Sequence, residues 1–174
     1  HHVVATTTST SKLDQLEQSG ADAVQLDVLD AAATLQAVDD AKPDAIIHEA
    51  TALASLGKSL RHLDRTFEMT NRLRTTGTRN LLAAAEASGV QRFVAQSFCG
   101  WPYGRTGAAV KTEADPLDAD PLPDCRETLE AIKELETMVT ASGGIVLRYG
   151  GLYGPGTSMA PGGAQYEMVR KRML

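Results

Sequence analysis

The stretch that decides the fold of this chain is Leu147-Arg148-Tyr149-Gly150-Gly151-Leu152-Tyr153-Gly154-Pro155-Gly156-Thr157. An apolar run, Ile145–Leu147, leads into this segment and predicts a strand that ends in a loop with four glycines and one proline. Glycines in such a loop let the backbone approach a flat ligand closely. We therefore expect a ligand-binding loop at the end of a buried strand.

Composition limits the classes of function. The chain has 174 residues, which favours one domain, and 43% of them are hydrophobic, which is enough for a core. A net charge of -5 provides no basic surface for nucleic acid. No apolar run has membrane-spanning length, and no charged-then-apolar leader is present. The two cysteines, Cys99 and Cys125, lack metal-ligand spacing, so we expect no metal site and a reducing, cytoplasmic location.

Apolar runs and helical patterns alternate along the chain. Strands are predicted at 2–6, 23–26, 45–47, 93–96 and 145–147. Helices are predicted at 11–20, 30–41, 60–88 and 128–141, with a long loop at 105–124. Ser11 is expected to begin a capping box and Asp30 to cap the second helix, with Leu35 and Val38 facing inward. This alternation favours a parallel sheet covered by helices.

Three segments together resemble the extended short-chain dehydrogenase/reductase superfamily, in its NAD(P)-dependent epimerase/dehydratase branch. They are the loop quoted above, the helical run Asn71–Leu82 (NRLRTTGTRNLL) and the segment Phe93–Gly104 (FVAQSFCGWPYG). The resemblance implies an α/β fold, a Rossmann-like doubly wound parallel sheet in three α/β/α layers. It also implies that residues 1–174 form a single NAD(P)-binding domain, with a substrate-binding region starting at about residue 155.

In this fold the first strand lies centrally and carries a glycine-rich turn for the cofactor pyrophosphate. The present chain starts at what resembles the second strand, so we predict a fragment that lacks its central first strand. The sheet would then have a gap at the position of the missing strand. Alternatively, another segment or chain would fill that gap, because unpaired backbone groups are unfavourable. The alternative is a natural short protein with rewired strand pairing.

The resemblance also assigns cofactor-binding positions. An Asp at the position of Asp27 accepts a hydrogen bond from the adenine amino group, and the backbone of Val28 contacts the ring, although Asp27 could equally be a helix-entry residue. Small residues such as Ala50 permit close approach of the cofactor. The full predicted set is Thr6, Thr7, Asp27, Val28, Ala50, Thr51, Ala52, Gln96, Lys133, Tyr149, Gly150, Gly151 and Leu152.

The choice between NAD and NADP depends on the residues after the first visible strand. An acidic residue there would bind the ribose of NAD, and a basic one would favour the phosphate of NADP. The segment Thr6–Thr8 carries neither. The missing carboxylate removes a repulsion against phosphate and so favours NADP, whereas the alternative is a polar loop that does not discriminate.

The catalytic residues of the superfamily are a Ser or Thr, a Tyr, and a Lys four positions after the Tyr. Lys133 matches the lysine, which lowers the pKa of the tyrosine. The tyrosine position then falls on Leu129, and the serine position falls near Cys99, with Ser97 close by. We name Lys133, Ser97, Cys99 and Tyr103 as candidate catalytic residues. For Lys133 the alternative is an ordinary exposed helix lysine near Glu130.

Leucine cannot transfer a proton, so three readings of Leu129 stay open. Another phenol, from Tyr103, Tyr149 or Tyr153, could replace the missing tyrosine with the help of Lys133. The chemistry could need no tyrosine. The protein could also bind a dinucleotide without catalysis.

Other polar residues are interpreted as structural. His48 lies in a strand and is expected to pack there. Gly77 and Asn80 are expected to serve packing, because glycine inside a helix is unfavourable without such a reason. Arg72, Arg74 and Arg79 are expected to be solvated or paired with carboxylates.

The sequence thus predicts an NAD(P)-dependent oxidoreductase or epimerase/dehydratase. Its substrate would be a small molecule with a hydroxyl or carbonyl group, such as a nucleotide sugar. The alternative is a non-catalytic dinucleotide-binding module or redox sensor. No nucleic-acid or membrane partner is expected, and a homodimer is a possible assembly.

Overall fold

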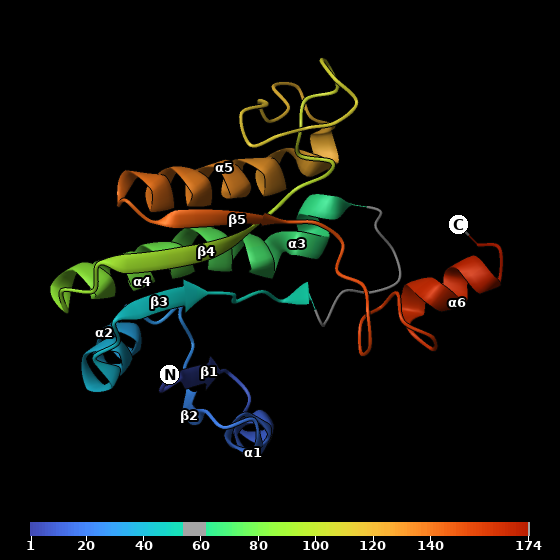
Figure 1. Ribbon diagram of the computed structural model, residues 1–174. Helices are drawn as coiled ribbons and strands as arrows, with labels where there is room; N and C mark the ends of the chain where they lie inside the picture. Colours follow the sequence, from blue (N-terminus) through green and yellow to red (C-terminus); the bar gives the residue numbers. More distant parts are fainter. Residues whose placement is uncertain (54–61, 174) are drawn as a thin grey trace.

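The computed structural model describes residues 1–53 and 62–173 and shows parallel strands connected by helices (Figure 1). The strands are β1 (Val4–Thr7), β2 (Asp22–Gln25), β3 (Ala45–His48), β4 (Arg92–Phe98) and β5 (Ile145–Tyr149). The α-helices are α1 (Leu13–Gln18), α2 (Ala31–Ala41), α3 (Leu63–Arg72), α4 (Thr78–Ala87), α5 (Arg126–Ala141) and α6 (Ala164–Arg170). The shorter elements are η1 (Thr10–Lys12), the π-helical turn η3 (Leu73–Gly77) and η4 (Pro123–Cys125). The α/β, Rossmann-like fold is confirmed.

The sheet is interrupted between β1 and β3. Strand β1 pairs with β2, and a separate sheet has the order β3-β4-β5, with parallel pairing throughout. Among the described residues no strand joins β1 to β3, and Figure 1 shows the β1–β2 pair set apart from the larger sheet. The predicted gap in the sheet between β1 and β3 is therefore confirmed, and these two strands do not pair with each other.

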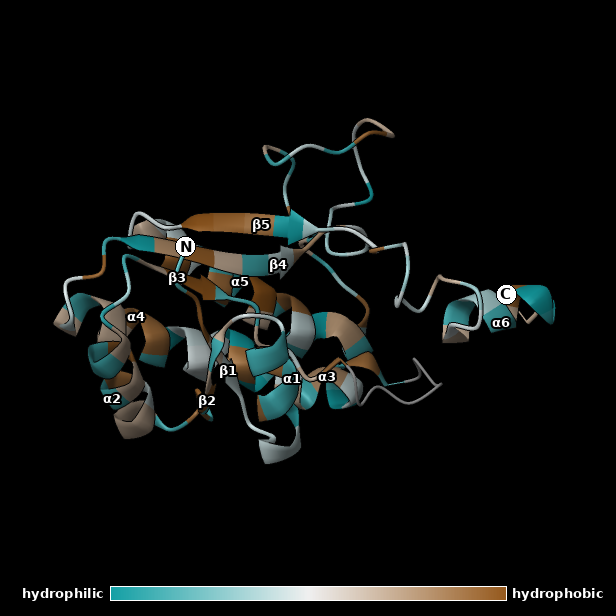
Figure 2. Ribbon diagram, turned by 60° about the horizontal axis from the view of Figure 1, so that its bottom comes forward, coloured by the Kyte–Doolittle hydropathy of each residue, from teal (hydrophilic) through white to brown (hydrophobic). Residues whose placement is uncertain are grey.

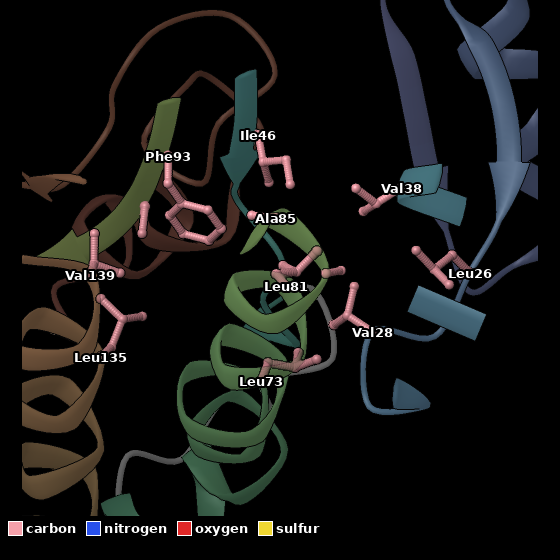
Figure 3. Packing of buried hydrophobic residues seen from close by; sticks show 12 residues of the cluster. Leu26, Val28, Val38, Ile46, Leu73, Leu81, Ala85, Phe93, Leu135 and Val139 are labelled. Atoms are coloured by element: carbon pink, nitrogen blue, oxygen red, sulfur yellow. The ribbon is translucent and has the colours of Figure 1, made fainter. Parts of the chain in front are cut away.

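Helices bury one face of the larger sheet. Alternate residues of β3 and β4, such as Ile46, Phe93 and Ala95, are buried and belong to one hydrophobic cluster with Leu135 and Val139 of α5 (Figure 3). Residues in between point to the opposite face, because side chains alternate along a strand. That face is apolar but open: Ile47, Ile145 and Leu147 are exposed, and Figure 2 shows the hydrophobic colour of β5.

The predicted long helix is one continuous rod built from α3, η3 and α4; residues 60 and 61 of the prediction lie outside the described residues. The π turn inside it was not predicted. At the last residue of the turn, Gly77 faces Val28, and a Cβ at Gly77 would lie 3.1 Å from Cγ2 of Val28. Nδ2 of Asn80 donates to the Val28 carbonyl at 2.9 Å. Both contacts hold η3 and α4 against the segment after β2, so the structural roles predicted for Gly77 and Asn80 are confirmed. Figure 3 shows Val28 of that segment beside Leu73 and Leu81.

The local predictions succeed in part. Asp30 caps α2, since its carboxylate accepts a hydrogen bond from the Ala33 N–H at 3.0 Å. The inward residues of α2 are Thr34 and Val38, so the prediction for Leu35, which is 44% exposed, is wrong. The capping box at Ser11 is also wrong: a 3-10 turn precedes α1, and the Ser11 hydroxyl pairs with Ser9 instead. No described helix is long and apolar enough to cross a membrane.

The first turn of α5 is capped by a side chain from another helix. The two carboxylate oxygens of Asp64, in the first turn of α3, accept the N–H groups of Glu127 and Thr128 at 3.0 and 2.8 Å. Cys125, at the N-cap of α5, makes no side-chain cap hydrogen bond. A carboxylate at this position satisfies unpaired donors and complements the helix dipole. Asp64 therefore joins the N-terminal ends of α3 and α5.

We expect Asp64→Ala to lower the free energy of unfolding by about 1 to 2 kcal/mol, because two donors of α5 lose their acceptor. Urea denaturation followed by circular dichroism measures the change. Glu68→Ala is the matched control, since Glu68 is an exposed acidic residue of the same helix. An equal loss in both variants would contradict the capping role of Asp64.

Candidate active site

Parallel strands bring their carboxyl ends to one edge of a sheet, and the candidate residues gather there. His48 ends β3, Ser97 and Phe98 end β4, and Tyr149 ends β5. In open α/β sheets this edge is where ligands bind. The loop that follows β5 starts with Gly150 and Gly151, as the sequence predicts.

A buried carboxylate joins the ends of β4 and β5. Oε1 of Glu136, from α5, accepts the Ser97 hydroxyl at 2.6 Å and Nε of Arg148 at 2.9 Å. Oε2 of Glu136 accepts Nη2 of Arg148 at 2.6 Å, which makes the pair bidentate. The Glu136 and Arg148 side chains are only 12% and 16% exposed. The hydrogen bonds to Glu136 raise the pKa of Arg148 above its usual value, so the guanidinium is charged.

Tyr103 belongs to the same network. Its phenol oxygen accepts Nη1 of Arg148 at 3.1 Å, and the guanidinium carbon lies 5.2 Å from the centre of its ring. The Glu136–Arg148 pair thus brings together two of the predicted catalytic residues, because Ser97 bonds to Glu136 and Tyr103 bonds to Arg148. The Ser97 proton is donated to Glu136, so toward a ligand the Ser97 oxygen offers lone pairs rather than its proton.

Cys99 and Tyr149 form a second group at the same edge. The Cys99 N–H donates to the Tyr149 carbonyl at 3.0 Å, and a Cβ on Gly150 would lie 3.5 Å from the Cys99 sulfur. The Tyr149 hydroxyl donates to Oε1 of Glu49 at 3.2 Å. The negative charge of Glu49 raises the pKa of Tyr149, which makes that phenol a weaker acid than an ordinary tyrosine.

The structure separates Lys133 from the other candidates. Its ammonium group donates to Glu130 at 2.8 Å, and its side chain is 34% exposed. It makes no hydrogen bond or ion pair with Ser97, Cys99 or a tyrosine among the described residues. Leu129, at the predicted tyrosine position, is fully buried with 0% exposure. Tyr153 is 85% exposed, so the described contacts link none of the three phenols to Lys133.

The predicted adenine-binding residues follow β2. Asp27 is exposed; its Oδ1 accepts the Leu29 N–H at 3.0 Å, which leaves Oδ2 for a ligand. Val28 is buried, and its carbonyl accepts Asn80, so only its backbone N–H is available to a ring. Thr6 is exposed at the end of β1 and Gln96 is half-buried in β4. These positions are compatible with the predicted roles, which stay predictions.

His48 packs as the sequence analysis expects. It is 4% exposed, and its Nε2 donates to the Leu73 carbonyl at 3.3 Å. Burial lowers the pKa of His48, so the ring is neutral near pH 7. The imidazole therefore fixes the end of β3 against η3. No group of three or more His, Cys, Asp or Glu residues in the described part of the chain is arranged to hold a metal ion.

Sequence reasoning missed the two residues that organise the edge, Glu136 and Arg148. A usable signal was present, because Arg148 interrupts an apolar strand and such a charge needs a buried partner. Of the arginines expected to be solvated or paired, Arg79 pairs with Glu134 at 2.6 Å and Arg72 is exposed. Arg74 contradicts that expectation, since it is buried and forms no ion pair among the described residues.

We expect Glu136→Gln to destabilise the protein by about 3 kcal/mol, because it leaves the Arg148 charge buried without a counter-ion. Thermal and urea denaturation measure the loss. Glu134→Gln is the matched control, since Glu134 makes a more exposed ion pair on the same helix. A loss no larger than that of the control would show that the Glu136–Arg148 pair does not hold the two strands.

Comparison with known proteins agrees with this arrangement. Residues 1–173 match the sequence profile described as the NAD dependent epimerase/dehydratase family. A 3-diazoavenalumate denitrifying reductase from a Streptomyces species is 40% identical over 166 residues, which cover 94% of this chain and 52% of that protein. The chain therefore spans about half the length of the curated relative that it matches.

Solved structures show the same fold at lower identity. The Bordetella bronchiseptica enzyme WbmG, in complex with NAD and UDP, has a TM-score of 0.71 and 20% identity; the match covers 99% of this chain and 52% of WbmG. A dTDP-4-dehydrorhamnose reductase from Clostridium acetobutylicum has a TM-score of 0.65 and 18% identity, covering 98% of this chain and 59% of the reductase. These structures share the fold, and the profile match over residues 1–173 shows that the chain belongs to the NAD-dependent epimerase/dehydratase family.

Proposed function

We propose that the protein to which this chain belongs is an NAD(P)H-dependent reductase that removes a diazo group from an aromatic acid. The proposal draws on the 40% identity to the denitrifying reductase. It differs from the sequence expectation of a hydroxyl or carbonyl substrate such as a nucleotide sugar. The likeness to WbmG supports the fold alone, at 20% identity.

The observation that carries the proposal is Leu129, an apolar and fully buried residue at the position predicted for the catalytic tyrosine. Reduction of a carbonyl group needs a proton donor at the new hydroxyl oxygen. Removal of a diazonium group does not: a hydride adds to the ring carbon, the carbon–nitrogen bond breaks, and its electron pair leaves with dinitrogen. The absence of a tyrosine at this position is therefore compatible with removal of a diazonium group.

The edge residues fit a nicotinamide dinucleotide, which supplies the hydride when it is bound. Asp27 offers a free carboxylate oxygen for the adenine amino group. Of the small residues that follow β3, Thr51 is exposed, whereas Ala50 and Ala52 pack against the core. Ser97, held by Glu136, and Tyr103, held by Arg148, would shape the substrate side. A homodimer and a cytoplasmic location stay predictions.

We expect the full-length protein to convert 3-diazoavenalumate with NADPH deuterated at the transferred position, and to place deuterium on the ring carbon that carried the diazo group. Mass spectrometry and dinitrogen release measure both products. The rate should vary little between about pH 6 and 9, because no proton donor acts. Tyr103→Phe and Tyr149→Phe should each keep at least about a third of the activity for the same reason.

Three outcomes would argue against this proposal. If a nucleotide sugar is supplied in place of 3-diazoavenalumate, deuterium on its hydroxyl-bearing carbon would support a nucleotide-sugar reductase or epimerase instead. A rate that falls at alkaline pH and is lost in one tyrosine variant would restore the substitute-phenol hypothesis. Cofactor binding without turnover of either substrate would support the redox-sensor alternative.

We also expect NADPH to bind the full-length protein at least as tightly as NADH. Thr6 and Thr8 are exposed, the Thr7 hydroxyl accepts the Ser9 N–H at 3.2 Å, and no carboxylate in this segment repels the 2′-phosphate. Fluorescence titration of the nicotinamide with both cofactors measures the two affinities. Thr6→Asp should shift the preference toward NADH. A strong NADH preference in the unmodified protein would contradict the interpretation of this segment.

A further inference from the structure

Arg74, in the π turn η3, is a buried cation that pairs with no carboxylate of the described residues. Its residue surface is 7% exposed, and none of the ion pairs among the described residues includes it. The segment 54–61, which lies outside the described residues, contains no Asp or Glu in its sequence. Burial lowers the pKa of Arg74 to about 10, so the guanidinium is still charged near neutral pH. A buried charge of this kind is unfavourable unless something pairs with it.

The contacts of Arg74 use only part of its hydrogen-bonding capacity. Nη1 donates to Oδ1 of Asn71 at 3.3 Å, and the guanidinium carbon lies 5.9 Å from the centre of the Phe67 ring. A guanidinium has five N–H donors, so most of them have no acceptor among the described residues. Asn71 in turn donates through Nδ2 to the Thr128 hydroxyl at 3.0 Å. The guanidinium is thus oriented by a neutral amide, and no carboxylate of the described residues compensates its charge.

The side chain extends toward the edge of the sheet where ligands are expected. Both partners, Asn71 and Phe67, precede Arg74 on the helix, so the guanidinium points toward the N-terminus of α3. Asp64 joins that N-terminus to the first turn of α5. Figure 1 shows both first turns at the end of the sheet toward which the arrows of β3, β4 and β5 point. Arg74 is therefore a buried cation directed at the carboxyl edge.

We propose that Arg74 pairs with an anionic oxygen group of a ligand bound at this edge, namely the carboxylate of an aromatic acid substrate. This inference rests on the proposed function and names the part of the substrate that is recognised. A carboxylate accepts two parallel hydrogen bonds from a guanidinium, and Phe67 provides an aromatic surface beside it. The cofactor pyrophosphate is the other source of anionic oxygens at this edge, and the experiment distinguishes the two.

The test measures binding of cinnamate and its neutral analogue cinnamamide to the full-length protein by calorimetry, with NADPH titrated separately. The unmodified protein should prefer cinnamate over cinnamamide by at least about 10-fold, because hydrogen bonds to charged groups are strong. Arg74→Gln should abolish that preference, and Arg74→Lys should keep part of it. Arg72→Gln is the matched control, since Arg72 is exposed and lies two residues away.

The results distinguish a substrate carboxylate from the cofactor pyrophosphate as the partner of Arg74, or exclude both. Loss of NADPH affinity in Arg74→Gln, with the cinnamate preference intact, assigns the site to the cofactor phosphates and overturns the substrate carboxylate. No preference for cinnamate in the unmodified protein overturns the proposal even if Arg74→Gln does not fold. Failure of diazo reduction with the cinnamate preference present would refute the proposed function and leave the anion site standing.

Discussion

The Glu136 carboxylate is the group on which the organisation of the sheet edge depends. A buried carboxylate is stable only when its lone pairs are used, and here they accept the Ser97 hydroxyl and two nitrogens of Arg148. One side chain therefore fixes the distance of α5 from the ends of both β4 and β5. Through Arg148 the same constraint reaches Tyr103 and positions the start of the long loop after β4.

The sequence predicted the succession of elements but not their details. All five strands lie where alternating apolar runs place them, and Asp30 caps its helix as expected. Strand ends differ by one or two residues, because β4 and β5 gain pairing partners beyond the apolar run. The π turn at Leu73–Gly77 was not predicted, because residues 60–88 were interpreted as one regular helix. Leu35 is exposed because the face of α2 that packs is defined by Thr34 and Val38.

The part of the candidate site that lies at the ends of strands could be predicted from the sequence. Ser97 and Tyr149 lie at strand ends, so the alternation of strands and helices was enough to place them at one edge. The state of Lys133 was not predictable, because one helical position decides whether a side chain reaches the sheet or pairs with Glu130. The pairing of Glu136 with Arg148, and the burial of Arg74, depend on packing between helix and strand or between two helices. Such contacts join elements that local patterns treat separately.

The π turn determines which neighbouring elements α3 and α4 can each contact. A π turn holds one residue more than the corresponding α-helical turn, so the residues after it are rotated about the helix axis relative to those before it. The helix can therefore present Asn71 toward Thr128 of α5 on one side of the turn and Asn80 toward Val28 on the other. Deleting a single residue between Leu73 and Gly77 would restore a regular helix and change that angular phase. Either the Asn71–Thr128 contact before the turn or the Asn80–Val28 contact after it would then be lost. The additional residue of the π turn therefore sets the rotation of α4 relative to α3.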